Sequence, residues 1–392
     1  MKKIVLFISS LWIGSSAFSQ SPVDTILSSI QQNNKVIQTN KKYWEARKLE
    51  YKTGLTPYDP QVEYDYLFGT PADAGNQRDF SITQRLDFPT TYKQKRVLSK
   101  QQASQADLQH EVVRQEVLLN ARLLVLELIH LNKRSGVLQQ RELKTAQLVQ
   151  DYQKKLDKGD VIVLDVNKAR LQLLNIQNEL ALNQNERQAI LTRLAELNGG
   201  ATIEVSDTSY PAPPVIPGFE TLDSLIEAND PLVKTYEGEK VIMEQQIAVQ
   251  KALNLPKIET GYHAQGILGQ SYKGVHAGVT IPLWENKNRV RAAQAGLDYA
   301  RSNVETLRLE HRLENKRLYD QLAVRTKAMR DYNALVATLN NTALLEKALR
   351  LGQITVIQYF QDESYYFSTY DRYLELEAEY HKTLAQLFKF RL

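Results

Sequence analysis

The sequence contains no cysteine among its 392 residues. It therefore has no disulfide framework, no thiolate metal site and no thiol that could carry an N-terminal lipid. Methionine is scarce too, with three residues, which argues against a methionine relay for soft metals. The formal net charge is +4, and it falls to +2 without Lys2 and Lys3. This near-neutral balance gives no electrostatic reason to expect a nucleic-acid partner.

Long apolar runs are missing as well, apart from one at the start. Residues 1–19 combine two lysines, an apolar stretch from Ile4 to Ile13 and the small residues Ala17 and Ser19. This pattern predicts a secretory signal peptide cut after Ser19. The stretch is too short for the alternative, a membrane-spanning anchor. We expect any membrane contact of the mature chain to be peripheral or made by strands.

Catalytic and metal-binding motifs are also missing. Gly199 and Gly200 are not followed by the lysine of a phosphate loop, and neither Gly-x-Ser-x-Gly nor His-Glu-x-x-His occurs. The six histidines show no ligand spacing, and the role of His263 and His276 stays open. We therefore expect no enzyme activity, no cofactor and no bound metal.

The chain does contain two pairs of Pro and Gly residues with the same spacing. Pro89 and Gly159 are 70 positions apart, and so are Pro282 and Gly352. Proline suits the first turn of a helix, and glycine tolerates the left-handed backbone that ends one. Each stretch therefore predicts one helix about 100 Å long.

The equal spacing belongs to a tandem duplication. Residues 25–37 align with residues 221–233 at an offset of 196, and after Pro89 the offset is 193. A stretch with four prolines within seven positions separates the copies and predicts a stiff linker. We expect a signal peptide at 1–19, a first repeat at 20–200, the linker at 201–220 and a second repeat at 221–392.

Four segments alternate apolar and polar residues, as half-buried strands do. They lie at 62–68, 79–88, 257–265 and 274–281, and Gly-rich connections join them into two hairpins. The polar faces would carry Glu63, Asp65, Glu259, His263 and His276. Each repeat thus contributes two amphipathic strands, four in each protomer.

The long helices carry apolar residues at alternating three- and four-residue steps. In the first copy this seam includes Ala121, Leu128, Leu138 and Tyr152, and it continues in the return helix through Ala169. Such spacing is typical of coiled coils. A helix this long with only a narrow seam must pair along its length with other helices.

Four strands are too few to close a barrel. In lipid an open sheet leaves its edge N–H and C=O groups unpaired, at several kcal/mol each. Closed membrane barrels begin at about eight strands, so strands that enter a membrane here require several copies of the chain. The sequence therefore predicts a closed oligomer.

These features together resemble the TolC-type outer-membrane efflux protein family over nearly the whole mature chain. The residues that carry the resemblance are the tandem repeat, the turn from Tyr152 to Gly159, the stop at Leu197-Asn198-Gly199, and residues 282–295, "PLWENKNRVRAAQA". The resemblance implies a trimeric α/β-barrel fold: a homotrimer with a twelve-stranded barrel in outer-membrane lipid and a helical tunnel in the periplasm.

The resemblance also implies a function and partners. The chain would be the outer-membrane duct of a tripartite efflux system, passively exporting what an inner-membrane pump and a periplasmic adaptor deliver. The sequence does not name the exported substrate or the type of pump. By position, the adaptor-docking tips would be Gly159, Asp160, Val161, Ile162, Gly352, Gln353, Ile354 and Thr355. We expect the β-branched residues beside each glycine to be exposed for this contact; a plain helix-hairpin turn is the alternative.

The expected tunnel constriction departs from the family pattern. Some members place aspartates six and nine residues after the second-repeat glycine, where this chain has Gln358 and Gln361. The candidates for a constriction are Asp165, Gln358, Gln361 and Asp362. A periplasmic adaptor or structural coiled-coil protein is the alternative function. An adaptor normally carries one hairpin within β-rich domains, whereas this chain predicts two equal hairpins.

Overall fold

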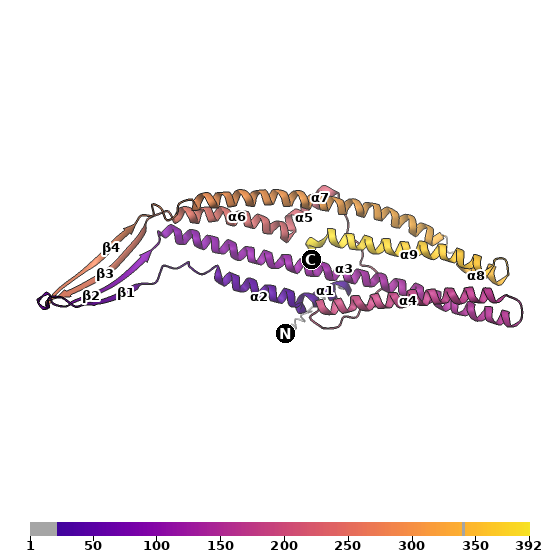
Figure 1. Ribbon diagram of the computed structural model, residues 1–392. Coiled ribbons are helices and arrows are strands. Elements are labelled where there is room, and N and C mark those ends of the chain that lie inside the picture. The colour runs from indigo at the N-terminus through magenta and orange to yellow at the C-terminus, as the bar shows by residue number, and fades with distance from the viewer. Residues whose placement is uncertain (1–21, 339–341) are drawn as a thin grey trace, which may run out of the picture.

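The computed structural model describes residues 22–338 and 342–392, and the predicted signal peptide at 1–19 lies outside them. The described chain is an elongated body of long helices with a β-sheet at one end (Figure 1). This is the predicted α+β combination of four strands and long helical hairpins. Within the described ranges, no helix has both the length and the apolarity needed to cross a bilayer.

The two halves of the chain place corresponding elements in the same order. The first half contains α1 (Pro22–Asn33), α2 (Lys35–Glu50), β1 (Gln61–Leu67), β2 (Gln77–Leu86), α3 (Pro89–Asp157) and α4 (Val163–Leu197). The second half contains α5 (Phe219–Asn229), α6 (Pro231–Ala252), β3 (Lys257–Ile267), β4 (Gln270–Thr280), α7 (Arg289–Thr338), α8 (Thr342–Arg350) and α9 (Val356–Leu387). Together, α7 and α8 of the second half correspond to α3 of the first. Short 3-10 turns lie at Ala72–Ala74 and Lys389–Arg391.

The helix α3 begins at the predicted proline. Pro89 is its first residue, and its 69 residues span about 100 Å. The helix ends at Asp157, and Gly159 follows with a left-handed φ of 81°. A helix of this length is stable because α3 packs along α4 and also along α6 and α9.

The second long helix does not begin at Pro282, as the equal spacing predicted. α7 starts at Arg289, seven residues later. Asn288 has a φ of 66°, which a right-handed helix cannot contain. The amide of Asn286 donates to the carbonyl oxygen of Leu253 at 2.7 Å, which fixes the preceding turn against the end of α6. The intervening residues are therefore a turn.

The predicted coiled-coil seam is buried. Ala121, Leu128 and Leu138 of α3 have no exposed surface, and neither have Ala169 and Ile176 of α4. The three- and four-residue steps bring these side chains to one line on each helix, so the two helices share a continuous apolar contact.

The four strands form one antiparallel sheet in the order β1-β2-β3-β4. The pairing of β2 with β3 joins the two halves of the chain. The register places Val62, Ile82, Tyr262 and Val275 in one row across all four strands, and hence on one face. Within the described part of the chain, the outer edges of β1 and β4 pair with no strand.

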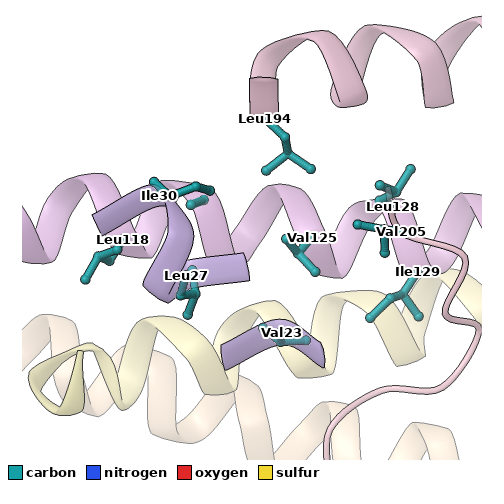
Figure 2. Packing of buried hydrophobic residues seen from close by; sticks show 10 residues of the cluster. Val23, Leu27, Ile30, Leu118, Val125, Leu128, Ile129, Leu194 and Val205 are labelled. Carbon is teal, nitrogen blue, oxygen red and sulfur yellow. The ribbon is translucent and has the colours of Figure 1, made fainter. Parts of the chain in front are cut away.

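The main apolar core lies at the middle of the body. Side chains from α1, α3, α4 and the linker meet there, as Figure 2 shows for Leu27, Leu128, Leu194 and Val205. The side-chain amide of Asn132 in α3 donates to two carbonyl oxygens of the linker, those of Val205 (3.1 Å) and Asp207 (3.0 Å). The linker is thus attached to the helical body.

Candidate functional sites at the two ends of the molecule

The turn between α3 and α4 and the turn between α8 and α9 lie together at the end farthest from the sheet (Figure 1). Both turns have the same construction. Gly159 and Gly352 take left-handed φ values of 81° and 71°. In the first turn, the N–H of Asp160 donates to the carbonyl oxygen of Lys155 at 2.9 Å, and the second turn repeats this bond at the same length. This is a Schellman cap, which needs glycine at its left-handed position.

The two hairpins pack against each other at this end. One apolar cluster, the tip cluster, draws residues from α3, α4, α8 and α9. Its buried members are Tyr152, Val166, Leu349, Val356 and Tyr359. The two turns therefore form one structural unit.

The predicted tip residues divide into inward and outward groups. Val161 and Ile354, which occupy equivalent positions, are half-buried against the tip cluster. The expectation that these β-branched residues are exposed is therefore wrong for both. The next residue, Ile162, is 58% exposed. Gln353 and Thr355 are exposed, and so are Gly159, Asp160 and Gly352.

An exposed apolar surface surrounds the turns. This tip patch consists of Ile162, Val163, Leu164, Leu351 and Ile357. The sequence prediction included Ile162 and missed the other four. A signal for two of them was present, because a run of four apolar residues at 161–164 in a tight turn cannot be buried on all sides.

The four candidate constriction residues do not converge within one chain. Gln361 lines a 530 Å³ groove between α4 and α9, whereas Asp362 lines a 390 Å³ groove beside α7 and α8. The Oε1 atom of Gln358 accepts a hydrogen bond from the N–H of Thr355 at 2.9 Å and so caps α9. Asp165 lies 3.8 Å from Lys168 on its own helix.

A third groove, of 630 Å³, runs between α3 and α8 beside the tip cluster. Lys144 in α3 and Glu346 in α8 form an ion pair of 2.6 Å along it. Lys155, Arg350 and Asp151 add further charge to its rim, and its lining includes aromatic and aliphatic side chains of the tip cluster. The groove can accommodate an amphipathic segment that carries charge.

A buried carboxyl group lies between α3 and α9, near this groove. Glu363 is 3% exposed, and the hydroxyl of Tyr359 donates to its Oε1 atom at 3.2 Å. Its Oε2 atom has no hydrogen-bond partner among the described residues. Burial raises the pKa of Glu363, although Arg141, Tyr359 and Lys144 oppose that shift. The contact between the hairpins is therefore partly polar.

The sheet at the other end has two unlike faces. On the polar face, Glu259 pairs with Arg85 at 2.6 Å and lies 3.4 Å from the Nε2 atom of His276. The opposite face is apolar and open: Val62 is 62% exposed and Val275 is 91% exposed. A sheet that exposes its apolar face needs an apolar surrounding or a partner.

Within residues 22–338 and 342–392, no group of three or more histidine, aspartate or glutamate residues is arranged to hold a metal ion.

No protein-family model matches the sequence, and no curated protein matches it. Several solved structures, however, share the fold over almost the whole chain. One is a membrane protein from Pseudomonas aeruginosa, with 14% identity and a TM-score of 0.78 over 95% of this chain and 90% of that chain. Another is the outer membrane protein VceC from Vibrio cholerae, with 12% identity and a TM-score of 0.75 over 94% and 95%. The Campylobacter jejuni CmeC outer membrane channel has 13% identity and a TM-score of 0.69 over 94% and 85%.

These likenesses place the chain in a structural class defined by its fold, an elongated helical body with a sheet at one end. Within that class, the chain has the fold of the TolC-type outer-membrane channels. This is the fold that the sequence resemblance implied.

Proposed function

We propose that this protein is the outer-membrane duct of a tripartite efflux system, through which substrates leave passively. The observation that carries this proposal is the sheet, with two unpaired edges and an exposed apolar face at the end of a helical body about 100 Å long. Lipid would cover the apolar face, and further copies would pair the edges. The solved channels of the same fold support this assignment.

The proposed assembly is a homotrimer. In the sheet each strand is antiparallel to its neighbour, so β4 and β1 run in opposite directions. The β4 strand of one copy can therefore form an antiparallel pair with β1 of the next. Three copies would close a twelve-stranded barrel, and two would reach only the smallest known size. The polar face, with Arg85, Glu259 and His276, would then line the lumen.

The helical end is proposed to stand in the periplasm and to receive the adaptor. The tip patch and the groove between α3 and α8 together offer apolar contacts and charged rims. The inner-membrane pump would act through that adaptor. The candidate constriction residues Asp165, Gln358, Gln361 and Asp362 would approach their counterparts only across copies. No catalytic role is proposed.

Cysteine cross-linking tests the assembly. Tyr64 in β1 and Val275 in β4 lie on the same face but are three strand spacings apart within one chain, about 14 Å. That distance exceeds the reach of a disulfide, about 7 Å. Because the chain has no native cysteine, any disulfide must come from introduced residues.

We expect the double variant Tyr64→Cys/Val275→Cys, or its neighbours in register with cysteine at Lys273 or Ala277, to give cross-linked dimers and trimers in outer membranes. The Tyr64→Cys single variant is the matched control and should stay monomeric on a denaturing gel. The purified assembly should also conduct ions across a planar lipid bilayer. Recovery as a soluble monomer without conductance would contradict the proposal and favour a structural coiled-coil protein.

A further inference from the structure

The two halves of the chain differ most at the junction between strand and long helix. In the first half, α3 begins at Pro89 almost directly after β2. In the second half, the turn at 281–288 separates β4 from α7. Three large apolar side chains of this turn are exposed: Ile281 by 64%, Leu283 by 69% and Trp284 by 78%. The helical packing buries none of the three.

This turn is held firmly in place. Asn286 is 8% exposed, and its amide is bonded to Leu253 at the end of α6. The ammonium group of Lys257 in β3 contacts both carboxylate oxygens of Glu285, at 2.9 and 2.8 Å. Within the turn, the carbonyl oxygen of Trp284 accepts a hydrogen bond from the N–H of Lys287 at 3.1 Å. The exposure of Trp284 is therefore a feature of an ordered turn.

The residues on either side of the turn change from apolar to cationic. Ile281 continues the alternation of Val275 and Val279 on the exposed apolar face of the sheet. After Trp284 come the exposed cations Lys287, Arg289 and Arg291, at the start of the helical body. Apolar strand, then tryptophan, then lysine and arginine is the order found where a protein leaves the hydrocarbon and enters the headgroup layer.

Aromatic residues also mark the far end of the sheet. Phe68, directly after β1, is 79% exposed and lies edge-on to Tyr66, with ring centroids 5.0 Å apart. The strand β4 has 11 residues, about 36 Å of extended chain. Tilted by about 40°, it rises about 28 Å, close to the apolar band of about 25 Å in outer-membrane barrels. Trp284 and Phe68 thus lie at the two ends of one bilayer-sized band.

We propose that the turn at 281–284 is an interfacial anchor, with Trp284 and Leu283 inserted at the boundary between headgroups and acyl chains of the phospholipid leaflet that faces the helical body. The inference rests on the proposed outer-membrane function and adds a lipid-contacting residue to it. The basic residues that follow would contact lipid phosphates. A second copy of the chain could cover the turn instead, and this alternative is an outcome of the test below.

Tryptophan fluorescence tests this directly, because the chain has three tryptophans and one of them, Trp12, lies in the predicted signal peptide. The mature chain would keep Trp44 in α2 and Trp284. The variant Trp44→Phe leaves Trp284 as the reporter, and Trp284→Phe leaves Trp44 as the matched control. Each is reconstituted as the full assembly into phosphatidylethanolamine–phosphatidylglycerol vesicles that contain lipids brominated either near the headgroup or near the chain end.

We expect Trp284 to show blue-shifted emission, with a larger fluorescence loss from shallow bromine than from deep bromine, while Trp44 stays unquenched. Unquenched, blue-shifted Trp284 emission would mean that another copy covers it, and red-shifted emission would mean solvent exposure; either overturns the anchor. Stronger quenching by deep bromine would also overturn it. Conductance of the same vesicles separates the two proposals: with conductance intact, only the anchor fails, and without insertion both fail.

Discussion

Asn34 and Asp230 lie 196 positions apart and cap the second helix of their respective halves with the same backbone geometry. Their φ and ψ values are −64° and 122°, and −65° and 122°. Both side chains accept a hydrogen bond from the first turn of the helix that follows, and both are buried, at 2% and 0% exposed. The two caps differ in charge. Asp230 lies 3.3 Å from His311 and 3.5 Å from Lys389, whereas the amide of Asn34 donates to a backbone carbonyl oxygen at 2.7 Å.

Replacing Asp230 should be costly. Asp230→Ala removes a helix cap and leaves the partly buried partners His311 and Lys389 without their carboxylate, so we expect a loss of about 3 kcal/mol. The midpoint of chemical unfolding, followed by circular dichroism, measures this loss. The milder Asp230→Asn keeps the cap and removes only the charge, so it should lose less. Equal stability of Asp230→Ala and the wild type would refute this role.

The Asp230 charge should also make stability depend on pH. Burial alone would raise the pKa of Asp230, but His311, Lys389 and the backbone N–H of Leu232 outweigh it and leave the pKa below its ordinary value. The stabilising contribution is therefore present above the pKa of the unfolded chain and is lost as the pH falls through the folded value. The wild type should be more stable than Asp230→Asn at neutral pH, and the two should become equally stable in acid. A constant difference across the pH range would contradict this.

The buried carboxyl of Glu363 should act in the opposite direction. Burial raises its pKa, so its contribution is favourable below the pKa of the unfolded chain and is lost as the pH rises through the folded value. We expect Glu363→Gln, which keeps the shape and the hydrogen bond to Tyr359, to match the wild type in acid and to exceed its thermal stability at neutral pH. A lower melting temperature of Glu363→Gln at neutral pH would show that the carboxylate is well paired.

Two glycines in the first hairpin should respond oppositely to alanine. Added side-chain atoms at Gly159 and Gly136 would meet no neighbour within 4 Å. Gly159, however, has a φ of 81°, whereas Gly136 lies within α3. Gly159→Ala should therefore cost about 1 kcal/mol, and Gly136→Ala should gain about 0.5–1 kcal/mol. Denaturant titration of both variants measures the difference, and the same sign for both would exclude backbone conformation as its cause.

Charged replacements at the tip should separate contact from stability. Ile162 is exposed in the tip patch, so Ile162→Asp should change the stability of the proposed trimer by no more than about 0.5 kcal/mol while abolishing export-dependent resistance of the cells. Val161 packs on the tip cluster, so Val161→Asp should destabilise the tip by about 1–3 kcal/mol. Trimer yield from outer membranes and cell resistance are read together. Full resistance with Ile162→Asp would contradict the proposal that the tip patch contacts the adaptor.

The features that local chemistry dictates are the ones that could be predicted from the sequence. Pro89 and Gly159 mark the limits of a helix because their own backbone preferences do so, and α3 follows them. Alternation fixed the faces of the four strands, and the register of the sheet places Val62, Ile82, Tyr262 and Val275 together as expected.

The features that depend on contacts between distant segments could not be predicted in this way. Pro282 has the same local preference as Pro89, but Asn286 bonds to Leu253, 33 positions away, and the helix starts later. The sequence predicts that Val161 and Ile354 are exposed in their turns, but the packing of the two hairpins against each other partly buries both. Gln361 and Asp362 line different grooves, and this too depends on which helices flank α9.

In the proposed trimer, the turn at 281–288 would also lower the symmetry of the ring. Three copies would present six hairpins of nearly the same construction, which by themselves would approximate a six-fold axis. The late start of α7 occurs once in each chain, so it would reduce the order of the axis to three at the level where helices meet strands. Alternate hairpins around the ring would therefore be inequivalent at that level, while their glycine turns would remain alike at the opposite end.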